Sequence, residues 1–587
     1  MSTPAQLTLL NIDLLHIIFS NFEYQDDLFN SLLVNSYWAL VIVDKLWKKP
    51  TWRSPNVFHK FVTTLRNSST TSFNYGNFVQ QITFTSYPEI SLPKPDIKII
   101  SEKCKNIKYL TFNRIASIEI VEMFLKNCPG LISFAIFSHK SSSLGIALRP
   151  IRDGKCSRLQ HLDLQHWKSE WKHDILKDIG NRCPLLTTLI ISSLVTNTLA
   201  TTIVNSFPNL KGFTCNTITG AGFTILISGF PKLKFLSLEF PYISFETALA
   251  VAMDFPPLES FNLRIKSYKG FDHFARLWVQ GQSYLQHIEF DSARGLSDDS
   301  FLPIAQYCHQ LESVELRSCT NLTDSSIMAL AKYRNIKLKR FTIIHCNQLT
   351  DLGLNDLAKY CNNLRKCTIL GCLNISHSSL SNIVKNCNNL QEFGFTNRPM
   401  MTPTIVMELI NNDLENFLEI LDIRSDDLAT ADSSVKKPYP KFDLNLMINL
   451  AEKCQNIRKL SLRFNMVGLS PDELIQAIHK FHKLEKLEIL TIGDKEFKKD
   501  HIKELETHRR LKEVKFVGNS ALDQDAKIYL VYRKTEGKLL NTLLEQNAHD
   551  EVSAIRVYPK SNYKISQPIL NTIKLKQCRE IGKLMEE

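Results

Sequence analysis

Fourteen cysteines draw attention first in this chain of 587 residues, because thiolates bind zinc and paired thiols form disulfides. Eight of them directly precede an x-x-L-x-x-L-x-L segment, and three follow such a segment. Other copies carry phenylalanine at the preceding position, so that position accepts any buried side chain. No C-x-x-C pair occurs, and we therefore predict reduced core thiols, no metal site, and a location in the cytosol or nucleus. The eight preceding cysteines are Cys104, Cys128, Cys156, Cys183, Cys308, Cys361, Cys387 and Cys454, and the three following ones are Cys319, Cys346 and Cys372.

The other residues capable of chemistry form no recognisable catalytic set. The sixteen histidines are scattered, and His161 and His287 fall at outward strand positions where a solvated imidazole is expected. The acidic pair Asp298 and Asp299 falls at a helix start, where carboxylates offset the helix dipole. The phosphate-binding, zinc-protease and serine-hydrolase motifs are all missing from the sequence. We therefore predict a protein that is not an enzyme and needs no cofactor.

The cysteines belong to a repeat that is clearest between Cys308 and Cys387. Three copies contain apolar residues in the spacing L-x-x-L-x-L, whose alternation is that of a strand. A polar turn follows, and then apolar residues at i, i+3, i+4 and i+7, which indicate a helix. The strand and the helix recur at an interval that falls within the roughly 20–29 residues of a leucine-rich repeat. The three apolar triplets are Leu311, Val314 and Leu316; Leu338, Phe341 and Ile343; and Leu364, Cys367 and Ile369.

Seventeen copies of this pattern run through the chain, and most follow one another at a similar interval. They predict an α/β fold, a leucine-rich-repeat solenoid with a parallel sheet on its concave face and helices outside. One longer gap, between Leu418 and Ile457, holds a polar segment, 424–443, which we interpret as a loop leaving the solenoid. The first apolar positions of the copies are Val79, Ile107, Leu131, Leu159, Leu186, Leu210, Leu233, Leu258, Leu285, Leu311, Leu338, Leu364, Leu390, Leu418, Ile457, Leu484 and Leu511.

The pattern changes at both ends of the chain, which suggests five segments. We expect a helical piece near 58–65, and further helices at 526–533 and 539–544 that would help to cap the last repeat. The segments are 1–6, a tail; 7–50, a small domain of three short helices; 51–77, a linker; 78–520, the repeats; and 521–587, a C-terminal cap and tail.

The apolar residues of the three short helices are too many for a module of this size to bury alone. The pieces Leu14–Phe19, Asp27–Leu28, Leu33–Trp38 and Leu46–Trp47 resemble an F-box. The three central repeats, with their cysteines, resemble the cysteine-containing leucine-rich repeats found behind F-boxes. The resemblance implies that the helices dock onto the Skp-type linker protein of a cullin-RING ubiquitin ligase.

The chain departs from the family at the first helix. Where the family usually has Leu-Pro and then Glu, this sequence has Leu10-Asn11 and Asp13, which leaves the first turn less pre-organised. The residues that the resemblance places in the linker contact are Leu10, Ile12, Leu14, Ile17, Ile18, Leu28, Leu32, Val34, Trp38 and Trp47. An ordinary helical cap for the repeats is the alternative interpretation.

Residues between and just after the strand leucines would face the concave surface and contact a target protein. Apart from Arg264, the charged residues at these positions are acidic in the earlier repeats, and they are mostly basic in the later ones, although a random distribution of surface charge is an open alternative. The candidate target-binding residues are Asp163, Glu239, Glu289, Asp291, Glu315, Arg317, Arg340, Lys366, Arg424, Lys459 and Arg463.

Two functions fit this organisation. The first is the substrate-recognition subunit of an SCF-type ubiquitin ligase, a monomer within a complex with the Skp-type linker, cullin and RING proteins and an unidentified target protein. The second is a non-catalytic interaction scaffold without ligase coupling. The net charge of +12 is spread over the whole length and no long, uninterrupted apolar run occurs, so neither a nucleic acid nor a membrane is expected as a partner.

Overall fold

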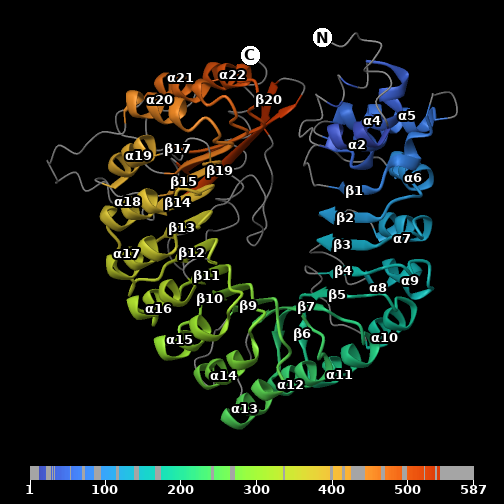
Figure 1. Cartoon of the computed structure of the whole chain (residues 1–587). Coiled ribbons are helices and arrows are strands. Elements are labelled where there is room, and N and C mark those ends of the chain that lie inside the picture. Colours follow the sequence, from blue (N-terminus) through green and yellow to red (C-terminus); the bar gives the residue numbers. More distant parts are fainter. Residues whose placement is uncertain are drawn as a thin grey trace. The chain divides into compact units, whose positions relative to one another are not determined.

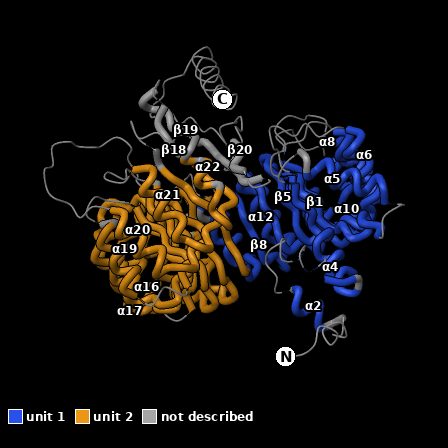
Figure 2. Tube along the Cα trace, turned by 90° about the horizontal axis from the view of Figure 1, so that it is seen from above, with its two compact units in different colours: residues 1–258 blue, residues 259–587 orange. Residues whose placement is uncertain are grey.

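The computed structural model divides the chain into two compact units, Met1–Leu258 and Glu259–Glu587, which Figure 2 shows in blue and orange. The described residues are 12–20, 28, 31, 34–52, 55–68, 73–84, 94–113, 118–137, 144–164, 173–239, 244–264, 271–334, 337–396, 401–412, 417–424, 443–463, 470–491, 499–520, 523–535 and 538–541. Among the described helices, none is both long and apolar enough to cross a lipid bilayer.

Unit 1 begins with helices and continues as alternating strands and helices (Figure 1). The strands β1 to β5, β7 and β8 pair successively in parallel, and β6 pairs with β7. The helices are α2 (Ile12–Ser20), α4 (Ser36–Lys48), α5 (Pro55–Arg66), η1 (Tyr75–Phe78), α6 (Lys94–Lys103), α7 (Ile118–Asn127), α8 (Leu144–Ala147), α9 (Arg149–Arg152), α10 (His173–Arg182), α11 (Asn197–Ser206), α12 (Gly220–Gly229) and α13 (Phe245–Met253). The strands are β1 (Gln81–Phe84), β2 (Tyr109–Asn113), β3 (Ser133–Phe137), β4 (His161–Leu164), β5 (Thr188–Ile191), β6 (Leu194–Val195), β7 (Gly212–Ile218) and β8 (Phe235–Glu239).

Unit 2 repeats the same alternation, and its strands β9 to β18 pair successively in parallel. The helices are α14 (Phe271–Trp278), η2 (Val279–Gly281), α15 (Asp298–Tyr307), α16 (Asp324–Arg334), α17 (Asp351–Tyr360), α18 (His377–Asn386), α19 (Met401–Asn411), α20 (Leu444–Lys453), α21 (Pro471–Lys480) and α22 (Lys499–Thr507). The strands are β9 (Ser260–Arg264), β10 (His287–Asp291), β11 (Ser313–Arg317), β12 (Arg340–Ile344), β13 (Lys366–Leu370), β14 (Glu392–Thr396), β15 (Ile420–Arg424), β16 (Lys459–Arg463), β17 (Lys486–Thr491), β18 (Glu513–Ser520), β19 (Asp523–Thr535) and β20 (Lys538–Asn541).

The repeat register predicted from the sequence is confirmed by the burial of its leucine-type positions. All seventeen first apolar positions are at most 2% exposed. In strands such as β3, β10 and β15 buried and partly exposed residues alternate, because successive side chains point to opposite faces of the sheet. Helices cover one face of each parallel sheet, as Figure 1 shows, and residues on these helices, such as Leu354 and Leu357 of α17, are buried as well. Each unit is therefore a stack of leucine-rich repeats with an α/β core.

Neighbouring repeats of unit 2 are joined by aspartates at the starts of the helices. The Asp324 carboxylate accepts hydrogen bonds from the backbone N–H and the hydroxyl of Thr350, at 2.9 and 2.6 Å. One repeat earlier, Asp298 accepts the same two bonds from Thr323, which directly precedes the next helix. Asp298 thus bonds to the start of the next repeat, a role beyond the dipole effect expected for it. The neighbouring Asp299 forms a surface ion pair with Arg276.

A recurring turn follows four consecutive strands of unit 2. Ser292, Ser318, His345 and Gly371 all have positive φ angles of 51 to 65°. The first three donate their N–H groups to the carbonyl of the last residue of the next strand, at 2.7 to 2.8 Å. Left-handed backbone costs a non-glycine residue about 1–2 kcal/mol, and this regular bond between repeats offsets the strain.

The C-terminal cap differs from the sequence prediction. The helix expected at 526–533 is wrong, because these residues belong to β19, which pairs antiparallel with β18. Its last nine residues, KIYLVYRKT, are rich in β-branched and aromatic residues, which favour a strand. Residues 539–541 of the second expected helix belong to β20. Most of the polar 424–443 segment, 425–442, lies outside the described residues, as does 542–544.

Candidate functional site

The N-terminal helices α2 and α4 form a small apolar core. It consists of Leu15, Phe19, Leu28, Val41 and Ile42, with Tyr37, Trp38 and Leu46 packed against it. The Trp38 ring meets the Phe19 ring edge-on, with centroids 5.1 Å apart. The α4 helix is capped by Asn35, whose side-chain oxygen accepts from the Trp38 N–H at 2.8 Å. Trp38, one of the two tryptophans expected at the linker contact, therefore packs against the internal core of the module.

The face of α2 opposite this core is apolar and exposed. Leu14, Ile17 and Ile18 are 48, 60 and 40% exposed, and Val34 is 57% exposed. On α2, the residues Leu14, Ile17 and Ile18 are spaced i, i+3 and i+4, so they share one side of the helix. Val34 lies beyond this helix in the sequence. Solvent-exposed apolar groups of this kind, gathered on one surface, are typical of a site that another protein covers.

The remaining residues predicted for the linker contact lie in different places. Leu28 is 5% exposed and belongs to the core. Trp47 is half-buried, and its ring lies 5.3 Å from Phe61 and 4.4 Å from Tyr75. Leu10, Leu32 and the side chain of Ile12 lie outside the described part of the chain.

The segment between the helices and the repeats contributes packing that the sequence did not reveal. It contains α5, whose Phe61 ring lies 5.3 Å from the rings of both Trp47 and Trp52. Trp52 in turn lies 5.5 Å from Phe84 on β1, and the Gln80 N–H donates to the carbonyl at the end of α4 at 3.0 Å. The apolar core therefore continues from α4 through α5 into the first strand of unit 1. Aromatic residues at 47, 52, 58, 61 and 84 were the signal available in the sequence.

The outward strand positions of unit 1 are mostly uncharged. Tyr109 and Phe235 are 43 and 47% exposed there, and neither was predicted as a binding residue. His161 is exposed as expected, and its Nδ1 atom lies 3.0 Å from the Thr188 hydroxyl. The predicted residue Asp163 is half-buried on β4, and Glu239 is half-buried at the end of β8.

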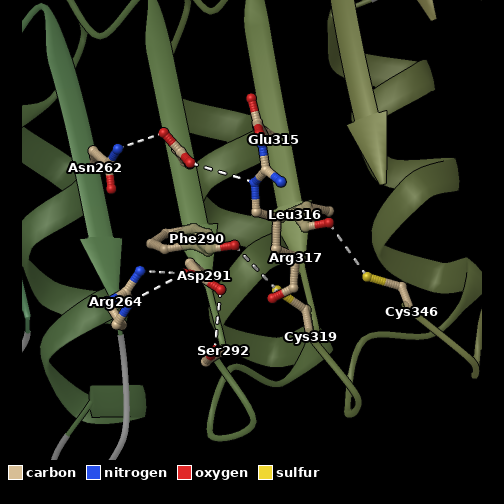
Figure 3. Close-up of polar contacts among 11 residues, drawn as sticks. Asn262, Arg264, Phe290, Asp291, Ser292, Glu315, Leu316, Arg317, Cys319 and Cys346 are labelled. Atoms are coloured by element: carbon tan, nitrogen blue, oxygen red, sulfur yellow. Dashed lines mark hydrogen bonds and ion pairs between the residues drawn. The ribbon is translucent and has the colours of Figure 1, made fainter. Parts of the chain in front are cut away.

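The first strands of unit 2 bring most of the predicted acidic residues together (Figure 3). Arg317 on β11 forms ion pairs with Glu315 on the same strand and with Glu289 on β10, the latter at 3.5 Å. Arg264 on β9 pairs with Asp291 at 3.0 Å. Because the parallel register places these residues side by side, the acidic group is largely neutralised within the sheet.

Burial and neighbouring charges shift the pKa values of two groups on β10. Burial, together with the neighbouring Glu315, raises the pKa of the Glu289 carboxyl above its ordinary value, although Arg317 opposes the change. Burial followed by the charge of Arg340 holds the pKa of His287 below its ordinary value. His287 is therefore a neutral hydrogen-bonding group near pH 7, and its Nδ1 atom lies 2.8 Å from the Ser313 hydroxyl.

The predicted basic residues on later strands are partly paired. Lys366 lies 3.0 Å from Glu392, and Arg424 lies 2.6 Å from Asp422. Arg340 and Lys459 form no ion pair within the described part of the chain. The backbone of Arg463 is described but its side chain is not. The acidic-to-basic gradient expected along the face is thus interrupted by local ion pairs.

The cysteines lie in the core, as predicted. All thirteen among the described residues are buried, and Cys578 lies outside these residues. Burial raises the pKa of Cys361 and of Cys387 to about 12, which leaves both thiols protonated and unreactive near neutral pH. The Cys387 thiol donates to the Cys361 carbonyl in the previous repeat at 3.5 Å. In the described part of the chain, no group of three or more His, Cys, Asp or Glu residues is arranged to hold a metal ion.

Comparisons with known proteins yield similar structures only. No family model and no curated protein sequence matches the chain. The crystal structure of the Rad7 and Elc1 complex in yeast matches 81% of this chain and 94% of that one, at 14% identity and a TM-score of 0.39. A leucine-rich-repeat protein of Leptospira interrogans matches 73% of this chain and 92% of its own, at 14% identity and a TM-score of 0.28. LegL7 from Legionella pneumophila, also a leucine-rich-repeat protein, matches 40% of this chain and 83% of its own, at 12% identity and a TM-score of 0.28.

Proposed function

We propose that the chain is the substrate-recognition subunit of an SCF-type ubiquitin ligase and is not itself an enzyme. The N-terminal helices dock onto a Skp-type linker protein, which connects the chain to the cullin and RING subunits. The outward faces of the repeat strands bind the protein that is to be ubiquitylated. The observation that carries the proposal is the exposed apolar face of α2, formed by Leu14, Ile17 and Ile18.

Burial of this face by a partner would be favourable. Covering a fully exposed Leu or Ile side chain is worth about 1.5–3 kcal/mol, and these three are already 40 to 60% exposed in the chain alone. The α2–α4 pair buries Leu15 and Phe19 on its other side, so the module does not need the exposed residues for its own core. A binding surface and a folded core can therefore coexist in a module of this size.

The proposal is tested by isothermal titration calorimetry of the whole chain with a purified Skp-type linker. We expect a Kd of about 1 μM or tighter, which corresponds to about −8 kcal/mol. Ile17→Asp places a carboxylate in the contact, where its desolvation is unfavourable, and should abolish binding. Ile146→Asp is the matched control, since Ile146 is also 60% exposed but lies on α8.

Two outcomes would overturn the proposal. One is a wild-type chain that does not bind the linker, in which case the interaction-scaffold function replaces ligase coupling. The other is equal loss of binding in Ile17→Asp and Ile146→Asp, which would place the contact outside the α2 face. Thermal unfolding of both variants shows whether the repeats remain intact.

A further inference from the structure

Five basic residues gather where strands β12 and β13 begin. Lys337, Lys339 and Arg340 lead into β12, and Arg365 and Lys366 lead into β13. Arg340 is paired in register with Lys366. The N–H groups of Arg365 and Lys366 both donate to the Lys339 carbonyl, at 2.8 and 3.0 Å. Because adjacent strands lie only ~4.8 Å apart, the sheet holds these residues at one edge, called here the basic edge cluster.

The outer members of the basic edge cluster have polar partners. Lys339 lies 2.8 Å from Glu312 on the side of β11, and Lys366 lies 3.0 Å from Glu392 on β14. The Lys337 ammonium group donates to the side-chain oxygen of Gln310 at 3.1 Å.

The two arginines at the centre of the cluster are different. Arg340 and Arg365 are exposed, and neither forms an ion pair with any residue that the structure describes. The charge of Arg340 reaches the start of β10, where it contributes to the lowered pKa of His287. Arg340 and Arg365 thus lie on neighbouring repeats at this edge, one register position apart, between ion pairs that use the flanking carboxylates.

This arrangement favours an external anion. Arg340 and Lys366 are directly opposed in the register, and like charges in such positions are destabilising, so a bound anion would relieve the repulsion between the two strands. A guanidinium group presents a planar fork of N–H donors that matches a carboxylate or a phosphate. Glu312 on one side and Glu392 and Glu419 on the other limit the anion-binding surface to about two strands. A ligand of this width is a short segment with two or three adjacent negative groups.

We propose that the basic edge cluster binds a short acidic segment of the target protein, whose carboxylates or phosphates are received by Arg340 and Arg365. The description of this ligand as a target rests on the proposed function. Binding itself involves unit 2 only and requires no linker protein.

The test is fluorescence anisotropy of the full chain with three labelled probes at about 150 mM salt, where charges beyond ~8 Å are screened. The probes are a deca-glutamate peptide, a neutral peptide carrying two adjacent phosphoserines, and a single-stranded oligonucleotide. Arg340→Glu/Arg365→Glu should weaken binding of the preferred peptide by at least about tenfold, because each arginine is replaced by a repelling charge. Arg149→Glu/Arg182→Glu is the matched control, since it makes the same charge change at two exposed arginines on helices of unit 1.

Tighter binding of deca-glutamate identifies carboxylates as the ligand, and tighter binding of the phosphopeptide identifies phosphates; both support the proposal. Failure of both peptides to bind overturns it, as does equal weakening by the control pair. Tighter binding of the oligonucleotide, lost with Arg340→Glu/Arg365→Glu, replaces the acidic peptide with a nucleic acid and also overturns it. Arg340→Gln/Arg365→Gln should weaken binding less than the Glu pair, and an unchanged thermal midpoint shows that the repeats are folded. Since no linker is present, failure here leaves the docking of α2 untouched.

Discussion

In the repeats, the seventeen leucine-type positions that lie just before the strands are at most 2% exposed, whereas on α2 Leu14, Ile17 and Ile18 are 40 to 60% exposed. Each repeat buries its apolar side against the next repeat, because the strands of consecutive repeats pair and their helices lie side by side. Among the α2 side chains that the structure describes, Leu15 and Phe19 are the buried ones, and they lie on one side of the helix. The same kinds of side chain therefore stabilise the fold in one region and remain available for a partner in the other.

The polar residues of the two regions differ as well. In unit 2, charged side chains such as Arg317 and Glu289 are paired across neighbouring strands that belong to consecutive repeats. On α2 the exposed side chains of Leu14, Ile17 and Ile18 are apolar instead, with the exposed His16 next to Ile17 in the sequence. Docking of α2 should therefore depend little on salt, whereas recognition by the strand edge of unit 2 should weaken as salt rises.

The largest difference between the regions should appear when leucines are truncated. Leu364→Ala removes a side chain that is fully buried between β13 and its helices, and we expect it to cost about 2–5 kcal/mol through loss of contacts and a cavity. Ile17→Ala should change the free energy of unfolding by no more than about 0.5 kcal/mol, since its side chain is 60% exposed. Urea unfolding of both variants measures the difference. A large loss for Ile17→Ala would mean that the α2 face belongs to a core.

A smaller effect should come from the aspartates that join repeats. Burial raises the pKa of Asp351, but hydrogen bonds from Ser376 and Ser379 outweigh it and hold the pKa below its ordinary value. A lowered folded-state pKa means that the carboxylate stabilises the fold above the ordinary value of about 3.9, and that this contribution is lost as pH falls through the folded pKa.

Asp351→Asn should therefore lower the urea midpoint at pH 7 more than at pH 3. Asp356→Asn, on the same helix, is the matched control, because the bonds that join this helix to the next repeat use the Asp351 carboxylate instead. A constant difference between wild type and Asp351→Asn across this range would contradict the joining role of the charge.

The repeat core was predictable because its signal is periodic and local. The L-x-x-L-x-L spacing specifies which side of each strand is buried, and seventeen repetitions reinforce one register. The positive φ angles at Ser292, Ser318 and His345 were not predictable, since none of them is a glycine and the turn depends on a bond to the next repeat.

The candidate surfaces were predictable only in part. The exposed side of α2 could be named from the resemblance to F-boxes, but the sequence did not separate Leu28, which is in the core, from Leu14, which is outside it. Ion pairs such as Lys366 with Glu392 depend on the lateral pairing of distant segments, so composition along the chain showed charge but not its neutralisation. The strand β19 was missed because a short amphipathic segment can form either a helix or a strand, and its partner strand decides.

The central claim is that the α2 face and the basic edge cluster are separate binding surfaces with separate ligands. The direct test measures the linker Kd by calorimetry and the acidic-peptide Kd by anisotropy for wild type, Ile17→Asp, Arg340→Glu/Arg365→Glu, and the combination of all three substitutions. Ile17→Asp should abolish linker binding and leave the peptide Kd within about twofold, and the arginine pair should do the reverse, since the two surfaces belong to different compact units and share no residue. A substitution at either surface that weakens both ligands would contradict the claim.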